Sequence, residues 1–317
     1  MINNNKKFTV VMYHYVRNLA ISNYPKINGL DLNLFKEQIH YFKKHYTFIT
    51  MKELIEAYEN NSDFPKNAIL LTFDDGYIDH YNHVFPILND CKIQGCFYPP
   101  ATTILNKQVL DVNKIHFILA SVENKNLIIN DIFNEMDKYR DCYNLKSNTY
   151  YFSKLAIKTR FDSAEVVFIK RILQVALLED LREKIVSHLF KKYVTSDEKS
   201  FSEELYMSKK HAKTMIEAGM HFGSHGYKHY WLSSLSRENQ EIEISKSINF
   251  LNDIGVDMNL WTMCFPYGDY NSDTLSLLKE YGCKAAFNTK VDIASFKNNR
   301  FEIPRLDTND LPKNRHE

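Results

Sequence analysis

Strand-like and helix-like segments alternate over two long stretches of this chain, and the alternation limits the folds it can adopt. The first stretch predicts strands at Phe8–Val16, Tyr46–Ile49, Ala68–Phe73 and Gln94–Tyr98, with helices at Leu32–Lys44, after the capping box Thr50–Glu53, and at Ile78–Leu88. The second predicts helices at Ser208–Ala218, Arg237–Ile254 and Ser272–Tyr281, with strands at Met220–Gly223, Leu260–Phe265 and Lys284–Asn288. Such alternation favours a parallel sheet or a (β/α) barrel.

The region between these stretches, at about 104–205, has a different character. It is rich in Leu, Ile, Lys and Glu at helical spacing and contains neither Gly nor Pro. We interpret it as a helical insertion within a single domain that spans residues 1–317. Capping a cleft, binding a carrier or forming a homo-oligomer are the roles open to it.

Charge and hydropathy exclude several classes of function. Lys and Arg number 40 against 39 acids in the 317 residues, so the net charge gives no basis for binding nucleic acid. The apolar run Thr9–Val16 is short and contains a His, and nowhere do 18 apolar residues run together, so we predict no signal peptide and no transmembrane segment. Five scattered cysteines fit reduced thiols, and we therefore expect a cytoplasmic protein.

Two adjacent acids follow the apolar strand Ala68–Leu71, in the run Thr72-Phe73-Asp74-Asp75-Gly76. Asp-Asp-Gly is often a simple turn. At the end of a buried strand, however, neighbouring carboxylates repel each other unless a cation or a proton holds them. Because successive strand residues point to opposite faces, one acid can bind a metal while the other handles a proton.

Three histidines recur at four-residue intervals in the segment His221 to His229. His221 belongs to the predicted strand, and we expect it to be packed or to support the ligands. His225 and His229 lie in the loop beyond, where (β/α) folds place their chemistry, and we predict both as metal ligands. Two imidazoles and one carboxylate form the three-ligand arrangement of a hydrolytic zinc site.

These segments together resemble the polysaccharide deacetylases of the NodB-homology type, carbohydrate esterase family 4. The run Thr72–Gly76 resembles their first motif, Ser224–His229 their second, and Phe265-Pro266-Tyr267-Gly268 their third. The resemblance covers about Phe8–Pro100 and Ser208–Asn309. It implies a distorted (β/α)7 barrel, here with the helical insertion between the first and second motifs, and hydrolysis of the N-acetyl group of an amino sugar.

The resemblance also implies a role for each motif residue. Asp74 would be the base acting on metal-bound water, and Asp75 would bind the metal with His225 and His229. The backbone N–H of Tyr267 would stabilise the oxyanion, and substrate contacts are predicted for Pro266, Tyr267 and Tyr77. The cofactor would be a divalent metal, with Zn²⁺ favoured because imidazole suits it.

The sequence departs from the family in three places. The third motif has Cys264 where many members have an Arg, so the Arg that tunes the base is missing. Asp307 or Asp310 are candidates for the fourth motif. The last motif, a strand that delivers a His general acid, is absent near the C-terminus, where His316 is a poor substitute.

A histidine at the other end of the chain offers a replacement. The strand Val10–Tyr13 ends in His14. In a closed barrel the first and last strands are neighbours, so His14 can enter the site, and a subgroup of the family acting on poly-N-acetylglucosamine looks similar in this respect. We predict His14 as the general acid, and a strand-end His bonded to backbone is the alternative.

The sequence thus predicts a metal-dependent amino-sugar N-deacetylase acting on a surface glycan or its carrier-linked precursor. Two alternatives remain open. One is a non-catalytic glycan-binding relative, and the other is an O-acetyl esterase or another amidase on the same scaffold.

Overall fold

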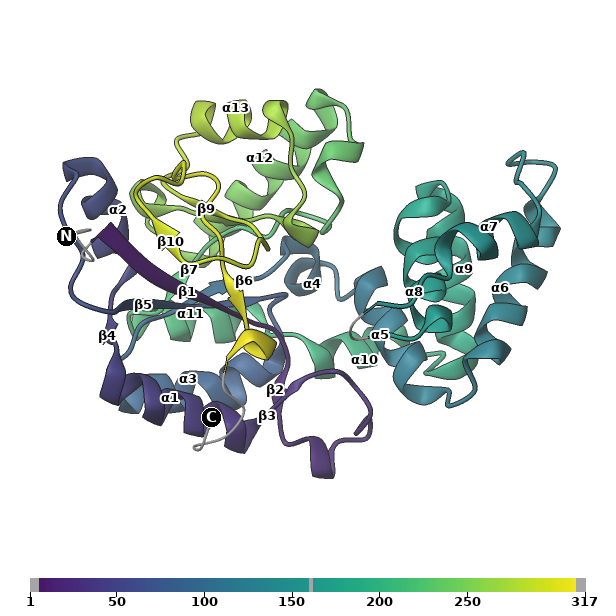
Figure 1. Ribbon diagram of the computed structural model, residues 1–317, viewed down its shortest axis with the longest axis horizontal. Helices are drawn as coiled ribbons and strands as arrows, with labels where there is room; N and C mark the ends of the chain where they lie inside the picture. The colour runs from purple at the N-terminus through teal and green to yellow at the C-terminus, as the bar shows by residue number, and fades with distance from the viewer. Residues whose placement is uncertain (1–5, 160–161, 312–317) are drawn as a thin grey trace. The chain divides into compact units, whose positions relative to one another are not determined.

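The computed structural model describes residues 6–159 and 162–311, which form two compact units (Figure 1). The sheet unit comprises the described parts of Met1–Asn18, Gly29–Lys107 and Glu203–Glu317, and the helical unit comprises those of Leu19–Asn28 and Gln108–Ser202. Among the residues that the structure describes, no helix has both the length and the apolar character to cross a membrane.

The core of the sheet unit is a mostly parallel sheet. Its main path runs β10 (Ala294–Ser295), β1 (Lys7–Tyr13), β5 (Ala68–Asp74), β6 (Gly95–Tyr98) and β7 (His221–Phe222). β4 (Thr47–Phe48) joins β5, and β11 (Leu306–Asp307) joins β1. All seven residues of β5 are buried, as expected of a parallel strand covered on both faces.

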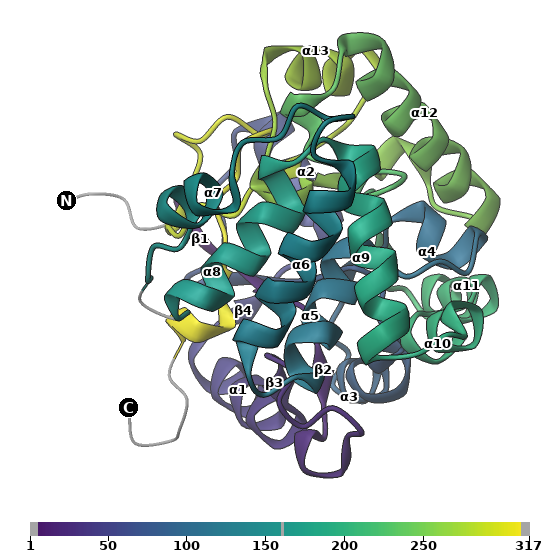
Figure 2. The same cartoon turned by 90° about the vertical axis from the view of Figure 1, so that its right-hand side faces the viewer.

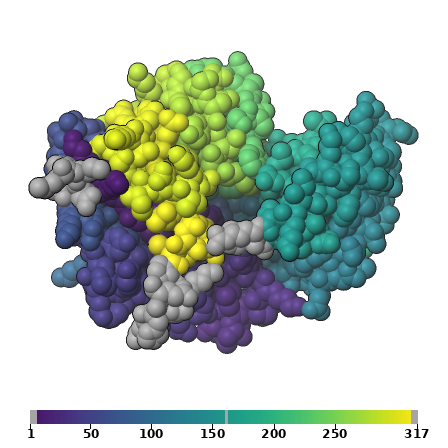
Figure 3. All heavy atoms as spheres, viewed as in Figure 1, coloured from purple at the N-terminus to yellow at the C-terminus, as the bar shows by residue number. Residues whose placement is uncertain are grey.

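Strand pairing continues past β7, the last strand of this path. A parallel bridge joins Ser224 to Met263 in β8 (Met263–Cys264), which pairs with β9 (Ala286–Phe287). A second bridge joins Phe287 to Ile303, shortly before β11, and β11 pairs with β1. The chain's first and last described segments therefore lie side by side, and Figure 3 shows them in purple and yellow.

Helices of the sheet unit follow its strands in the predicted order. They are α1 (Leu32–His45), α2 (Met51–Asn60), α3 (Phe85–Asp90), α4 (Ala101–Leu105), α11 (Lys209–Glu217), α12 (Arg237–Ile254) and α13 (Ser272–Glu280). The capping box predicted at Thr50 is confirmed, because its hydroxyl accepts from the Glu53 amide and the Glu53 carboxylate accepts from the Thr50 amide. The predicted alternation of strands and helices is confirmed.

Several predicted bounds are wrong in detail. The first strand ends at Tyr13 rather than Val16, and Val16–Arg17 forms β2, which pairs with β3 (Leu30–Asp31). The helix predicted at Ile78–Leu88 does begin at Ile78, but it passes through a π-helical segment, η3 (His80–Val84), and continues as α3 to Asp90. Leu260, predicted as the first residue of a strand, instead ends the 3-10 turn η6 (Met258–Leu260), and β8 begins at Met263.

The helical unit contains α5 (Asp111–Ser121), α6 (Lys125–Tyr139), α7 (Asn148–Leu155), α8 (Ala164–Arg171), η4 (Ile172–Ala176), α9 (Glu179–Tyr193) and most of α10 (Glu198–Leu205). Figure 2 shows several of these helices packed side by side. Residues Leu19–Asn28 join this unit although they precede α1, and the Tyr24 ring packs on Phe117 with centroids 4.8 Å apart.

Candidate active site

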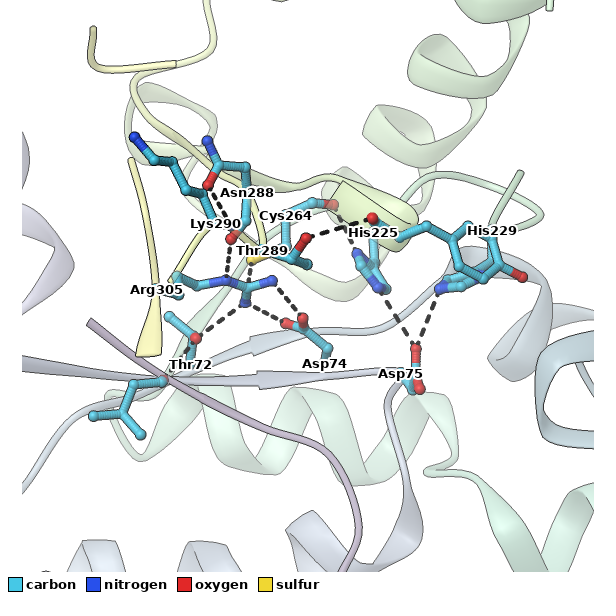
Figure 4. A network of polar contacts seen from close by, with 12 residues as sticks. Thr72, Asp74, Asp75, His225, His229, Cys264, Asn288, Thr289, Lys290 and Arg305 are labelled. Atoms are coloured by element: carbon cyan, nitrogen blue, oxygen red, sulfur yellow. Dashed lines mark hydrogen bonds and ion pairs between the residues drawn. The ribbon is translucent and has the colours of Figure 1, made fainter. Parts of the chain in front are cut away.

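The two adjacent acids lie at the end of β5 and point to different partners (Figure 4). Asp74 is the last residue of the strand, and Asp75 has left the strand geometry with a φ of 70°. Both side chains are almost fully buried. Gly76 also has a φ of 70°, and a Cβ there would lie 2.6 Å from that of Pro99, so the turn that follows the two acids requires glycine.

Asp75 faces the two predicted histidine ligands. The Nε2 atoms of His225 and His229 each lie 3.5 Å from Asp75 Oδ1. His225 Nδ1 lies 2.7 Å from the carbonyl oxygen of Cys264. Because a carbonyl can only accept, Nδ1 carries the proton and Nε2 presents a lone pair toward Asp75.

This cluster fits a divalent cation. One ligand atom from each of Asp75, His225 and His229 lies within 4.8 Å of the others. Asp75 Oδ1 is buried and has no hydrogen-bond partner among the described residues, so its lone pairs are free to coordinate a cation. Burial lowers the pKa of His229 to about 3, which keeps its lone pair free for a metal. The oxygen and nitrogen donors therefore form the predicted ligand set.

The structure identifies an arginine that the sequence analysis missed. Arg305 is fully buried and binds both oxygens of Asp74, from Nη1 to Oδ1 at 2.9 Å and from Nη2 to Oδ2 at 2.7 Å. Nη1 also lies 3.1 Å from Cys264 Sγ. The prediction that no arginine tunes Asp74 is therefore wrong, because Arg305 reaches the place beside Cys264 from the segment between Ile303 and β11.

Charge controls the ionisation of both acids. Burial raises the pKa of Asp74, but the Arg305 guanidinium and His225 outweigh it and hold that pKa well below its usual range. Burial also raises the pKa of Asp75, while His229 and then His14 lower it to a net value below normal. Both groups are therefore carboxylates at neutral pH.

Helix α12 and helix α4 hold the loop that carries the two histidines. Glu243 on α12 is buried, and its Oε2 accepts from the backbone amides of Tyr227 at 3.0 Å and Lys228 at 2.8 Å. The amide of Ala101, the first residue of α4, donates to the carbonyl of Gly226 at 3.2 Å. Glu243 had no signal in the sequence, since a Glu on an amphipathic helix is usually exposed.

His14 follows the last residue of β1 and is half-buried. Tyr13 pairs with Phe73 in the parallel register, so His14 lies beside Asp74 at the same edge of the sheet. After larger contributions from other groups, electrostatic interaction with His14 lowers the pKa of both Asp74 and Asp75. His14 is thus close enough to act electrostatically on the site, and its role as an acid stays a prediction.

Two residues predicted to contact substrate are buried. Tyr77 is fully buried, and its hydroxyl donates to Asp75 Oδ2 at 2.5 Å, so the contact that the structure shows for it is with the predicted metal ligand. Pro266 is also buried and lies against the loop at Gly226, within 3.5 Å of where a Cβ there would be. Substrate contact by either side chain stays a prediction.

Tyr267 lies between His229 of the Asp/His/His cluster and an aromatic neighbour. Its ring meets His229 edge to face with centroids 4.6 Å apart and stacks on Trp231 at 4.3 Å. Its φ is 59°, a strained conformation for a bulky residue. The following Gly268 has a φ of 70°, and a Cβ there would overlap Thr289 Oγ1. The fold thus fixes the backbone of the third motif.

The remaining predicted residues lie away from the Asp/His/His cluster or outside the described residues. His221 is buried and its Nε2 lies 2.8 Å from Thr262 Oγ1, which agrees with the packed role predicted for it. Asp307 and Asp310 cap the turn η8 (Thr308–Asp310), so Arg305 is the residue of this segment that reaches Asp74. His316 lies outside the described residues.

The fold and the site define a mixed α/β protein with an Asp/His/His cluster beside a second, arginine-bound carboxylate. Residues 153–286 match the family model described as polysaccharide deacetylase, which confirms the resemblance that the motifs indicate. That segment contains the second and third motifs, whereas the first motif precedes it.

A sequence comparison with curated proteins also finds a deacetylase. The poly-β-1,6-N-acetyl-D-glucosamine N-deacetylase of Escherichia coli (strain K12) is 29% identical over 106 residues, which is 32% of this chain and 16% of that protein. The chain therefore aligns with about a sixth of the length of this curated relative.

Solved structures share the fold at low sequence identity. The Streptococcus pyogenes deacetylase PplD, solved in complex with acetate, has a TM-score of 0.57 at 18% identity over 95% of this chain and 92% of its own. IcaB from Ammonifex degensii has a TM-score of 0.57 at 17% identity over 96% and 93%.

Proposed function

We propose that this protein is a metal-dependent hydrolase that removes the N-acetyl group from an amino sugar of a glycan or its carrier-linked precursor. One observation carries the proposal. Two neighbouring buried acids have separate partners, because Asp75 faces two imidazoles whereas Asp74 is bound by Arg305. A simple turn does not need this division, but a hydrolytic site with a ligand and a separate base does.

The proposed fold is a distorted (β/α)7 barrel in one domain, with the helical region at about 104–205 as an insertion. In support, strand pairing runs from β1 through β5, β6 and β7, and bridges lead on to β8, β9 and Ile303. The segment that contains Ile303 continues into β11, which pairs with β1.

The proposed cofactor is one divalent metal bound by Asp75, His225 and His229, with Zn²⁺ favoured. When bound, such a metal polarises the substrate carbonyl and lowers the pKa of a water molecule. Residues of the chain provide the ligand atoms and fix their orientation. Asp75 supplies a charged oxygen, and the His225 tautomer is fixed by the Cys264 carbonyl.

In the proposed reaction, Asp74 takes a proton from the attacking water while Arg305 keeps the carboxylate ionised and oriented. The water oxygen adds to the acetamide carbon, and the backbone N–H of Tyr267 stabilises the negative oxygen. His14 then donates a proton to the sugar nitrogen as the C–N bond breaks. The products are acetate and the free amine.

The substrate class comes from similarity to the relatives. The Escherichia coli relative carries the name of a deacetylase of poly-β-1,6-N-acetyl-D-glucosamine, which is an N-acetylated polymer. The same site would also serve an O-acetyl ester or another amide, and a glycan-binding protein without turnover is the remaining alternative. A cytoplasmic location and a homo-oligomer remain predictions from the sequence.

The experiment measures metal content and acetate release together. Wild type, Asp75→Ala and Asp74→Asn are compared on nucleotide-linked and oligomeric N-acetylamino sugars, with matched O-acetyl sugars. We expect about one metal per chain in wild type, loss of metal in Asp75→Ala, and retained metal without turnover in Asp74→Asn. No metal in wild type together with an unaffected Asp75→Ala would contradict the proposal, and faster release from the O-acetyl sugars would favour the esterase.

A further inference from the structure

His80 is a buried histidine for which the proposed reaction has no use. It is the first residue of the π-helical turn η3 and is fully buried. Its Nε2 lies 2.8 Å from the backbone carbonyl oxygen of His14. Because a carbonyl only accepts, Nε2 carries the proton, and the neutral ring presents a bare Nδ1.

Packing alone does not account for an imidazole at this position. Nδ1 of His80 is buried without a hydrogen-bond partner among the described residues. Its ring lies among aromatic neighbours, at 5.5 Å from Phe73 and 5.8 Å from Phe97 between centroids. A phenyl ring would fill such a place without leaving a polar atom unpaired. What a histidine adds at this position, and a phenylalanine could not, is therefore the N–H that donates to the His14 carbonyl.

The chain after β1 is fastened to the segment after the first motif at three points. His80 holds the carbonyl of His14, Arg17 Nε binds Asp79 Oδ2 at 2.8 Å, and the Tyr15 ring stacks on Tyr77 at 4.0 Å. Arg17 and Tyr15 follow His14, so they fix the direction of the chain beyond it. The bond from His80 fixes the peptide of His14 itself.

We propose that His80 is a positioning residue, which holds the backbone of His14 so that its imidazole faces the substrate nitrogen. This inference rests on the proposed function, in which His14 protonates the leaving amine. Burial lowers the pKa of His80 to about 4, so the ring stays a neutral donor at neutral pH. π-helical turns often occur at functional sites, and η3 places His80 at its first position.

The test uses His80→Phe, which removes the donor, and His80→Gln, whose side-chain amide can place an N–H near the position of Nε2. We expect His80→Phe to lower kcat at least tenfold with unchanged metal content, and His80→Gln to stay within about threefold of wild type. In a His14→Ala background, His80→Phe should cost less than twofold more, because the group that it positions is gone.

A matched control separates positioning from general damage. His221→Phe replaces another buried histidine, and its effect should multiply with that of His14→Ala as for independent sites. If the effects of His80→Phe and His14→Ala also multiply, or if His80→Phe keeps full kcat, the inference is wrong.

A second readout does not need turnover. The imidazole resonances of His14, assigned by comparison with His14→Ala, should move in the NMR spectrum of His80→Phe and stay in place in that of His80→Gln. Unmoved resonances in His80→Phe would overturn the inference even if wild type hydrolysed no sugar. Failure of the proposed function would instead appear as a wild type without acetate release, whatever these spectra show.

Discussion

At the scale of single residues, the pairing of Asp74 with Arg305 is the feature that sequence reasoning could least foresee. The two residues are 231 positions apart, so no local spacing connects them. The small side chain of Cys264 leaves space for the guanidinium, which contacts its Sγ. The motif residues Asp75, His225 and His229 could be predicted, because each lies in a short pattern at a strand end.

Replacing Arg305 by Lys tests the importance of the two-point contact. A lysine ammonium is a single point and cannot bind both Asp74 oxygens as the guanidinium does. We expect Arg305→Lys to fold and to lose about 10²-fold in kcat, a loss of order 10²-fold being typical when a reacting group is misplaced. Arg300→Lys, on the same segment, is the control in a steady-state acetate assay. Equal kcat for the two variants would contradict the assigned role.

Replacing Tyr77 by Phe tests its support of the metal ligand. The change removes the hydroxyl that donates to Asp75 Oδ2 and keeps the ring that stacks on Tyr15. We expect the affinity for Zn²⁺ to fall by about tenfold, as for other groups that orient metal ligands. Competition with a chelator measures the affinity. Tyr98→Phe, which removes a buried hydroxyl bonded to Thr262, should change it by less than about twofold.

At the scale of elements, short strands and strained turns position the chemistry. β7, β8 and β9 have two residues each, and the functional groups lie just after them or in the adjoining turns. Asp75, His229 and Tyr267 all have positive φ values, which a pattern of apolar residues does not predict. Sequence reasoning therefore predicted the strands and motifs. The positive φ values of the turns and the π-helical conformation of η3 could be recognised only in the structure.

Glu243 offers a test of how an element supports the site. Its carboxylate accepts from two backbone amides of the histidine loop, and Glu243→Ala leaves both without that partner. We expect a loss of about 1–3 kcal/mol in the free energy of unfolding. The rise in melting temperature on adding Zn²⁺ should also shrink. Glu243→Gln keeps an acceptor and should fall between wild type and Glu243→Ala. Glu241→Ala, on the exposed side of the same helix, loses only a surface hydrogen bond from Tyr281 and should stay within about 0.5 kcal/mol of wild type. A Glu243→Ala variant as stable as Glu241→Ala would argue against this role.

At the scale of the whole molecule, the predicted alternation of strands and helices is confirmed, because long periodic segments carry strong local signals. The sequence did not indicate which distant segments pack together. Residues Leu19–Asn28 belong with the helices of Gln108–Ser202, and aromatic contacts such as Tyr24 with Phe117 connect them. These contacts join residues far apart in the chain, so the pattern around Leu19 could not indicate them.

Buried neutral histidines should make the stability of the whole protein depend on pH. Burial lowers the pKa of His221 to about 3, against about 6.5 in an unfolded chain. Between these values the unfolded chain binds a proton that the folded protein does not, so stability is full above pH 6.5 and falls as the pH drops toward 3. His221→Phe removes this contribution. In metal-free protein, the destabilisation caused by His221→Phe should therefore be about 2 kcal/mol smaller at pH 5 than at pH 7. Urea unfolding at both pH values measures it, and an equal effect at the two would show that His221 does not stay neutral in the folded state.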